Sequence, residues 1–449
     1  MSFVFSEAEK EEALKTYIDF LRRPSVSASG EGIRDTANYL VGLLSSLGVK
    51  ASVEETGGHP VVLGEYNVGA KQTILVYNHY DVQPVDPLDE WVHPPFSAAV
   101  TGGKVFARGA SDNKGTLIAR LYGFKKLVAE GKLGVNLKFI FEGEEEIGSP
   151  NLEGYVQRTV HKLGADAVIM EGGGLDAKGR PQVILGVKGL LYVELNRVSG
   201  VRDLHSSNAP IVYNPAWDLV KLLGSLVDDE GRVRIEGFYD DVRPLTDLEA
   251  ELLRSYDTTP EETIKALGVK RLRYSSTEKL RVALFTEPTC NIDGFSSGYT
   301  GPKSKTIVPA KAMAKLDFRL VPNQDPHKVF ESLQTHIKKH GFDVECRLLG
   351  AETPVRTQPN TRVVIAMRES AKKVYGVEPV VLPNSAGTQP MGVFTRILGV
   401  NECVSAIGVG SASSNAHAPN ENVEIENFYK AIQHSAEFFY TYPKIQLQV

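Results

Sequence analysis

The sequence predicts an α/β fold, with a mostly parallel sheet covered by helices on both faces and a second, inserted α+β domain. Residues 72–77 are apolar without alternation, as expected of a strand buried on both faces of a sheet, and residues 135–141 and 166–170 are expected to form the next strands. Helical patterns at residues 115–130 and 151–163 separate these runs, and strands that alternate with helices indicate a largely parallel sheet. At 449 residues the chain exceeds the usual length of a single core, so two domains are expected.

The first domain opens with two amphipathic helices and two strands before the first buried strand. Their ranges are 6–21 and 32–47 for the helices, and 50–54 and 60–66 for the strands. The helix–strand pattern returns after Thr361 and closes with a helix at residues 425–440. We therefore assign residues 1–187 and 355–449 to one discontinuous domain.

The character of the sequence changes after Gly189. Residues 191–198 and 312–320 alternate apolar and polar side chains, which indicates a sheet with one face open or covered by helices. Helices are expected at 215–227 and 325–340, a further strand at 343–349, and a polar region rich in Asp, Glu and Arg at 228–279. We assign residues 188–354 to the inserted α+β domain.

The composition resembles that of ordinary soluble proteins, with 42% hydrophobic and 23% charged residues. The net charge of -5 and the lack of a Lys/Arg-rich run offer no basic surface for nucleic acid. No apolar run approaches membrane-spanning length, and the first ten residues turn acidic before a signal-peptide core could form. Cys290, Cys346 and Cys403 lack paired spacing, which fits a reducing compartment and excludes a thiolate metal site. We expect a cytoplasmic protein without nucleic-acid or membrane partners.

A cluster of acids follows the buried strand that ends at Phe141. It consists of Glu142, Glu144, Glu145 and Glu146, and a Gly-Ser-Pro break comes directly after. Like charges crowded at the tip of a strand repel one another, so a positive partner is expected there. Taken alone, such a cluster is more often a solvated acidic turn.

Further residues of metal-ligand type are His79, Asp81, Asp112, Glu171 and His417. Each alone has an ordinary structural explanation; Asp112, for example, could simply cap a helix. Because residues two apart in an extended segment point the same way, Asp81 could orient the ring of His79. Together the residues mark the C-terminal ends of four successive strand or strand–loop units, the edge where ligands bind in open α/β sheets. Two imidazoles with several carboxylates and no thiolate suit Zn²⁺, Mn²⁺ or Co²⁺ in a two-metal site.

The charges of such a site balance. Two divalent cations bring four positive charges, of which Asp112, Glu146 and Glu171 cancel three and a bridging hydroxide cancels the fourth. Glu145 then remains free to act as a base.

Four segments carry a family resemblance. They are residues 78–84 (Asn-His-Tyr-Asp-Val-Gln-Pro), 107–115 (Ala-Arg-Gly-Ala-Ser-Asp-Asn-Lys-Gly), 141–149 (Phe-Glu-Gly-Glu-Glu-Glu-Ile-Gly-Ser) and 203–206 (Asp-Leu-His-Ser). They resemble the motifs of the di-metal (zinc/manganese) peptidase and deacylase clan. That clan includes carnosine-type dipeptidases, glutamate carboxypeptidases, aminoacylases, and the acetylornithine and succinyl-diaminopimelate deacylases. The resemblance runs from about residue 10 to the C-terminus, and the overall likeness is closest to the cytosolic dipeptidase branch.

The resemblance implies a role for each residue of the site. His79 and Glu171 would bind one metal ion, Glu146 and His417 the other, and Asp112 would bridge them. Glu145 would be the general base, and the bond from Asp112 to Asn113 is typically cis in this clan.

The inserted domain would be the lid and dimerisation domain of a homodimer. His205 would reach into the neighbouring protomer's site as a transition-state stabiliser, although on a polar loop it could also be a surface histidine. Arg319 would grip the substrate carboxylate, although on an alternating strand it could be an outward-facing charge. Thr306, Gly387 and Thr388 match substrate-binding positions of the dipeptidases.

The expected reaction is metal-dependent hydrolysis of the amide bond in a dipeptide or short peptide that has a free C-terminal carboxylate. Glu145 would take the proton of a metal-bridging water and pass it to the leaving amine. Many dipeptidases of the clan carry Asp where this chain has Glu171, whereas deacylases and carboxypeptidases more often carry Glu. An N-acyl-amino-acid deacylase is therefore the second hypothesis, and an inactive binding protein on the same fold is a third.

Overall fold

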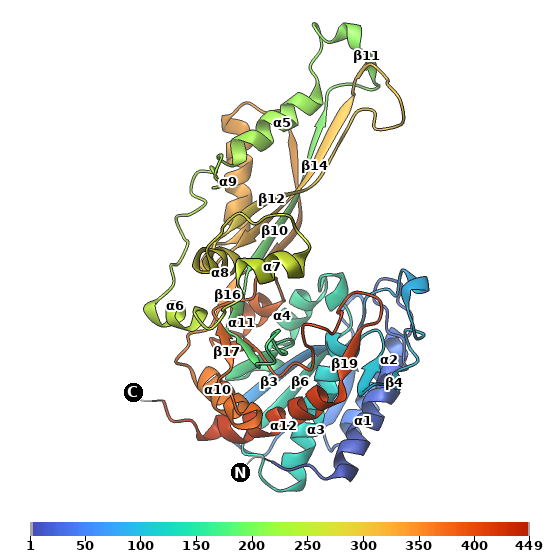
Figure 1. Cartoon of the computed structure of the whole chain (residues 1–449), viewed down its shortest axis with the longest axis vertical. Helices are drawn as coiled ribbons and strands as arrows, with labels where there is room; N and C mark the ends of the chain where they lie inside the picture. The colour runs from blue at the N-terminus through green and yellow to red at the C-terminus, as the bar shows by residue number, and fades with distance from the viewer. Residues whose placement is uncertain (1–2, 448–449) are drawn as a thin grey trace.

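The computed structural model describes residues 3–447 as a broad α/β body on which an elongated lid stands (Figure 1). Residues 1, 2, 448 and 449, at the ends of the predicted first domain, lie outside the described residues. No helix within residues 3–447 is both long and apolar enough to cross a membrane.

The body is built on a sheet with the strand order β1-β2-β6-β3-β7-β18-β8-β17. Its strands are β1 (Lys50–Glu54), β2 (Val61–Tyr66), β3 (Thr73–His79), β6 (Asn136–Glu142), β7 (Ala167–Met170), β8 (Gln182–Ile184), β17 (Val380–Leu382) and β18 (Cys403–Ser405). The central strands β6, β3, β7 and β18 are parallel, whereas β1 and β2 form an antiparallel margin. The predicted α/β class with its mostly parallel sheet is confirmed.

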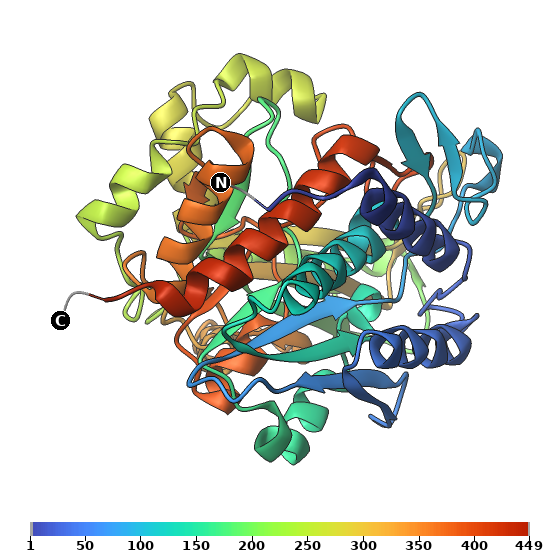
Figure 2. The same cartoon turned by 90° about the horizontal axis from the view of Figure 1, so that it is seen from below.

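Helices cover both faces of this sheet, as predicted. One face carries α1 (Glu7–Leu21), α2 (Ile33–Ser46), α3 (Gly115–Ala129), α10 (Arg362–Tyr375) and α12 (Ile425–Thr441), and the other carries α4 (Leu152–Leu163) and α11 (Met391–Leu398). Figure 2 shows α12 (red) running alongside α3 (teal) over the sheet. In β3, Ile74 and Val76 enter one core while Leu75 and Tyr77 enter the other. Because both faces are apolar, the strand shows no alternation.

Short elements at the edge of the body frame the loops of the site. They are the small sheet β4 (Ala99–Thr101), β5 (Lys104–Phe106) and β19 (Asn422–Glu424), the π-helix η2 (Ala110–Lys114), and the 3-10 turns η1 (Leu88–Glu90) and η3 (Glu145–Ile147). A further 3-10 turn, η5 (Tyr442–Lys444), follows α12 and packs against α10. The sheet pairs β5 with β19, so it joins the loop around Asp112 to the loop that contains His417.

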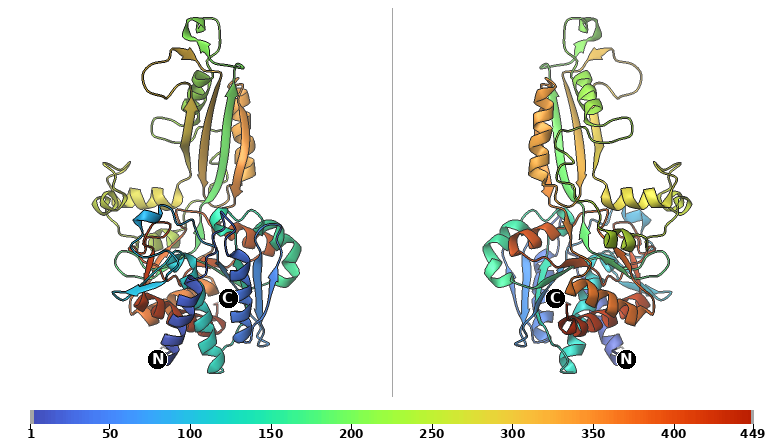
Figure 3. Two further views of the ribbon diagram at one scale, coloured as in Figure 1. Left: turned by 90° about the vertical axis from the view of Figure 1, so that its right-hand side faces the viewer. Right: turned by 90° about the vertical axis from the view of Figure 1, so that its left-hand side faces the viewer.

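The lid is an antiparallel sheet in the order β12-β14-β10-β15, with helices on one face (Figure 3). Its elements are β10 (Gly189–Val198), β12 (Thr289–Ser297), β14 (Lys311–Leu320), β15 (Glu345–Glu352), α5 (Pro215–Leu226) and α9 (Pro326–Lys339). Leu191, Val193 and Leu195 face the helices, and the residues between them face outward, which accounts for the alternation in the sequence. At the tip, β11 (Leu204–His205) pairs with β13 (Ile307–Val308) ahead of the turn η4 (Ser206–Asn208).

The chain passes between the body and the lid at two paired short strands, β9 (Gly186–Val187) and β16 (Val355–Arg356). This crossing supports the proposed division at residues 187/188 and 354/355. The polar region expected at 228–279 contains two helices that were not predicted, and a third, also not predicted, begins at its end. They are α6 (Asp247–Leu253), α7 (Pro260–Leu267) and α8 (Thr277–Thr286). Leu253 and Phe285 of this segment pack with Val380 and Leu382 of β17, so part of the insertion rests against the body.

Candidate metal centre and active site

The predicted site residues of the body gather at the C-terminal edge of the parallel strands. β3 ends at His79, β6 leads into the turn with Glu145 and Glu146, and Glu171 follows β7 directly. η2 supplies Asp112, and the peptide bond that follows it is cis.

His79 is fully buried, and its ring is held from both sides. Nδ1 lies 3.0 Å from the carbonyl oxygen of Asp81, which can only accept a hydrogen bond, so Nδ1 carries the proton of the neutral ring. Nε2 faces two carboxylates, with Asp112 Oδ1 at 3.0 Å and Glu171 Oε2 at 2.8 Å.

His417 repeats this arrangement on the other side of Asp112. Its Nε2 lies 3.0 Å from Asp112 Oδ2 and 3.1 Å from Glu146 Oε2. The two oxygens of Asp112 therefore each face a different histidine. This is the geometry required of a carboxylate that bridges two cations.

The contacts fit divalent cations better than protons. A proton on Nε2 of His79 can satisfy only one of two carboxylates, and Glu171 Oε2 is buried without a hydrogen-bond partner among the described residues. Ligand atoms of His79, Asp112 and Glu146 lie within 4.8 Å of one another, and so do those of His79, Glu145 and Glu171. Imidazole and carboxylate donors without thiolate suit Zn²⁺, Mn²⁺ or Co²⁺.

The electrostatics show the same excess of negative charge. Burial raises the pKa of Glu145 well above its ordinary value, and the carboxylate of Glu171 raises it further. Hydrogen bonds to Asp112 and Glu146 raise the pKa of His417 to about 10. In the absence of cations, the site therefore favours protons on Glu145 and His417.

Asp81 supports the site in a way that its predicted role only partly describes. Its carboxylate oxygen lies 3.5 Å from Nδ1 of His79, farther than its carbonyl oxygen does. The carboxylate accepts hydrogen bonds from the backbone N–H groups of Glu145 at 3.2 Å and Glu146 at 3.0 Å. Asp81 thus holds the ring of His79 and the acidic turn together.

The remaining acids of the turn are buried supports rather than solvated charges. Glu142 accepts hydrogen bonds from the hydroxyls of Tyr77 at 2.7 Å and Ser149 at 3.1 Å, and burial raises its pKa to about 8. Glu144 accepts bonds from Asn151 and from the backbone N–H of His59.

Two residues that the sequence analysis did not single out also contact the site. Gln83 donates a hydrogen bond to Glu146 Oε2 at 2.8 Å, and Glu421 binds the backbone of the loop that contains Asp112. Gln83 lies within the motif at residues 78–84, so its place in that motif could have indicated a role at the site. Glu421 lies four residues after His417, but its partners are more than 300 residues away along the chain.

The predicted substrate residues Arg319 and Thr388 meet at the junction of lid and body. Arg319 Nη1 donates a hydrogen bond to Thr388 Oγ1 at 2.7 Å, and Thr388 Oγ1 donates to the carbonyl oxygen of Lys188 at 2.9 Å. The carbonyl oxygen of Gly387 accepts from the backbone N–H of Lys188. Arg319 is therefore anchored beside the loop at 384–388.

His205 and Thr306 lie apart from the other site residues, at the lid tip. His205 is exposed on β11, and the carbonyl oxygen of Thr306 accepts a hydrogen bond from the backbone N–H of Ser206. Figure 1 shows β11 at the end of the lid farthest from the body. Within one chain, the structure does not bring these two residues to the predicted metal ligands.

A cavity of about 500 Å³ opens onto two of the predicted metal ligands. Asp112, Glu171 and Gln389 are among the residues that line it. Gln389, the neighbour of Thr388, also accepts a hydrogen bond from Ser405 at the end of β18. The cavity therefore leads from the predicted metal ligands toward Thr388, to which Arg319 is hydrogen-bonded.

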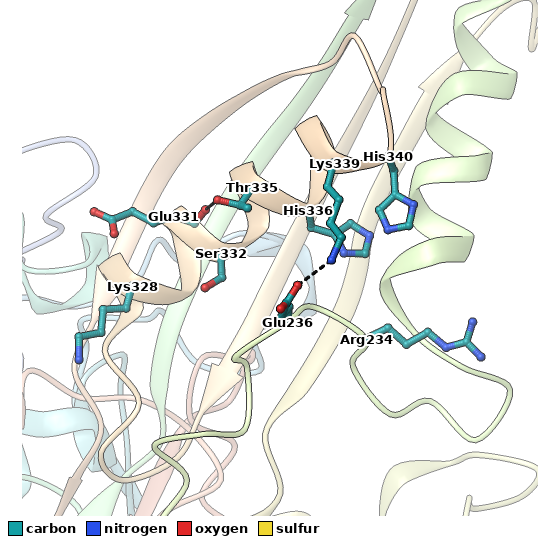
Figure 4. A pocket seen from close by; sticks show the side chains of 9 residues that line it. All are labelled: Arg234, Glu236, Lys328, Glu331, Ser332, Thr335, His336, Lys339 and His340. Carbon is teal, nitrogen blue, oxygen red and sulfur yellow. Dashed lines mark hydrogen bonds and ion pairs between the residues drawn. The ribbon is translucent and has the colours of Figure 1, made fainter.

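A second cavity, of about 620 Å³, lies in the lid between α9 and the segment with Arg234 and Glu236 (Figure 4). Lys339 pairs there with Glu236 at 2.7 Å, and His336 bonds to Ser225 at 2.9 Å. None of the predicted site residues lines this cavity, so the candidate active site is the first one.

An α/β body with one carboxylate shared between two histidines and a glutamate beside them defines a two-metal hydrolase. Residues 75–441 match the sequence pattern of the family described as "Peptidase family M20/M25/M40", and the chain belongs to this family. The predicted family resemblance is confirmed.

Known members include peptidases of several kinds. The chain is similar to the M20 family metallo-carboxypeptidase Sso-CP2 of Sulfolobus solfataricus, with 61% identity and a TM-score of 0.93 over 97% of this chain and 100% of that one. It is 30% identical over 439 residues to a Cys-Gly metallodipeptidase of Schizosaccharomyces pombe, covering 91% of each chain. The di-peptidase Dug1p of Saccharomyces cerevisiae is 26% identical, with a TM-score of 0.80 over 98% of this chain and 97% of that one.

Proposed function

We propose that this protein hydrolyses the peptide bond of dipeptides or short peptides with a free C-terminal carboxylate. The observation that carries the proposal is Asp112, whose two oxygens each face one histidine while Glu145 lies beside them. His79 and Glu171 would hold one divalent ion and Glu146 and His417 the other. Zn²⁺ is our first assignment, with Mn²⁺ and Co²⁺ as alternatives. When bound, the two ions would polarise the scissile carbonyl and lower the pKa of the attacking water.

Glu145 would move the proton in this reaction. Its backbone is fixed by Asp81, and its carboxyl group lies among the ligand atoms of His79 and Glu171. It can take a proton from the attacking water and deliver that proton to the leaving amine.

Arg319 would select the free carboxylate of the substrate. Its Nη1 is anchored by Thr388, whereas Nη2 has no protein partner among the described residues. A guanidinium held on one side presents its remaining N–H groups to a carboxylate with little loss of freedom. The backbone of Gly387 would complete this end of the substrate site.

We also propose a homodimer formed through the lid, in which His205 and Thr306 complete the partner's site. The lid carries exposed apolar side chains near its tip, with Val201, Ile211 and Tyr213 each at least 80% exposed. Mixing His205→Ala and Glu145→Gln protomers should restore activity, because one site of each heterodimer then has both groups intact. Verified heterodimers that stay inactive would overturn the shared site.

A metal-replete substrate screen tests the activity itself. Purified protein with added Zn²⁺, Mn²⁺ or Co²⁺ would be offered dipeptides, longer peptides, and N-acetyl and N-succinyl amino acids. Release of C-terminal residues from free peptides supports the proposal and separates dipeptidase from carboxypeptidase action by substrate length. Hydrolysis of only the N-acyl compounds would favour the deacylase. The argument for a deacylase is Glu171, because deacylases of the clan more often carry Glu at this position.

The free thiols of Cys290, Cys346 and Cys403 support a reducing compartment such as the cytoplasm.

A further inference from the structure

Glu421 is a fully buried carboxylate in the loop between His417 and β19. Each of its two carboxylate oxygens accepts two hydrogen bonds. Oε1 accepts from the backbone N–H groups of Ser111 at 2.8 Å and Asp112 at 3.0 Å. Oε2 accepts from the backbone N–H of Gly109 at 2.9 Å and from Nη1 of Arg108 at 2.9 Å.

These bonds fix the backbone from which the shared carboxylate projects. Three backbone donors of the turn at 109–112, from Gly109, Ser111 and Asp112, converge on the side chain of Glu421. The ion pair with Arg108 offsets the cost of burying the charge of Glu421. The backbone carbonyl of Glu421 also accepts from the N–H of Ala107. Because His417 lies four residues earlier, Glu421 ties the loop of one predicted ligand to the loop of another.

We propose that Glu421 is a positioning residue that holds Asp112 between the two histidines before any metal ion binds. This inference rests on the two-metal site of the proposed function. Without Glu421, the backbone N–H groups of Gly109, Ser111 and Asp112 lose a common acceptor, and the turn can adopt other conformations. Metal affinity then falls, because binding must also order the turn.

The test is a titration of the metal-free protein with Co²⁺, in which binding is monitored by the visible absorption of the bound ion. Glu421→Gln keeps the size of the side chain, but its NH₂ group must face N–H donors on one side. We expect Co²⁺ affinity to fall about 10- to 100-fold, with a changed absorption spectrum. Wild-type affinity and spectrum in this variant would overturn the proposal.

Glu437→Gln is the matched control. Glu437 is equally buried and accepts hydrogen bonds from the backbone N–H of Phe3 at 2.7 Å and from Lys373 at 2.6 Å, away from the metal ligands. We expect this change to lower thermal stability and leave Co²⁺ affinity unchanged. An equal loss of affinity in both variants would mean that Glu421 acts only through general stability, which would also overturn the proposal.

A second measurement uses the wild-type chain and does not depend on whether a variant folds. Hydrogen exchange of the metal-free protein should show protected amides at Gly109, Ser111 and Asp112. Free exchange at all three would contradict a turn that is formed in advance. Neither measurement uses a peptide substrate. If the wild type binds two Co²⁺ ions but cleaves no peptide, the proposed activity fails while this inference stands.

Discussion

Replacement of Arg319 by Met provides a quantitative test of how the substrate is selected. Arg319 is anchored by Thr388, and its Nε lies 3.5 Å from Asp317 Oδ1, so the side chain is positioned before substrate arrives. Met keeps most of the apolar stem and removes the charge and the donors. The lid sheet should therefore remain intact.

The expected loss follows from one charge-assisted contact. Hydrogen bonds to charged groups contribute roughly 1.5–3 kcal/mol, which corresponds to a loss of about 10- to 150-fold in kcat/KM for a dipeptide. Arg319 is 37% exposed, so solvent screening places the expectation nearer the lower figure. A dipeptide amide lacks the carboxylate and should show a similar loss with the wild-type protein.

The assay is a double-mutant cycle across wild type, Arg319→Met, the dipeptide and its amide. If Arg319 binds the carboxylate, the variant should discriminate little between the two substrates. Arg347→Met is the control, because Arg347 lies on the same lid sheet but pairs with Glu345. Equal losses for the dipeptide and its amide in Arg319→Met would refute the carboxylate contact.

Three further predictions concern the proton, the metal ions and pH. Glu145→Gln should lower kcat by about 100-fold or more with metal content unchanged, measured by kinetics and elemental analysis, since a general base contributes about 10²–10⁴-fold; near-normal turnover would remove it from that role. Chelation should lower Tm by several degrees in calorimetry, because the carboxylates around Asp112 repel one another without cations, and re-addition of Zn²⁺ should restore it. Burial, with the charge of Glu153, raises the pKa of Glu352 from 4.5 to about 7. The neutral form is favoured in the fold, so its stabilisation is present below pH 4.5 and lost as pH rises through 7. In urea unfolding, Glu352→Gln should therefore stabilise the protein at pH 8 relative to pH 5 by on the order of 2 kcal/mol, whereas Glu345→Gln, exposed on the same strand, should not.

Much of the site was accessible from the sequence because parallel strands impose a simple rule. Their C-terminal ends meet at one edge, so a residue just after an apolar run, such as His79 or Glu171, can be placed near others of its kind. The lid tip follows no such rule. The motif at 203–206 identified His205, but within one chain its position depends on the length and direction of β10 and β14. Its place in a dimer remains a prediction.

The helices α6, α7 and α8 show a different limit of sequence reasoning. The polar composition of this region concealed them, although local signals were present. Thr246 and Glu249 form a capping box at the start of α6, and Thr259 and Glu262 form one at the start of α7. A polar composition indicates that a helix is largely exposed to solvent, whereas a capping box indicates the residue at which the helix begins. The second signal is the better guide where a helix buries few side chains, as α7 does.

The acidic turn shows why residue type alone could not assign every role. The four glutamates at the end of β6 and in the turn that follows have different surroundings. Glu142 and Glu144 bond to hydroxyl, amide and backbone donors, whereas Glu145 and Glu146 share Asp81 as the acceptor of their backbone N–H groups and direct their carboxylates to the histidines. A lone solvated turn would need none of these partners. The supports that distinguish the four come from distant parts of the chain, and only the fold brings them together.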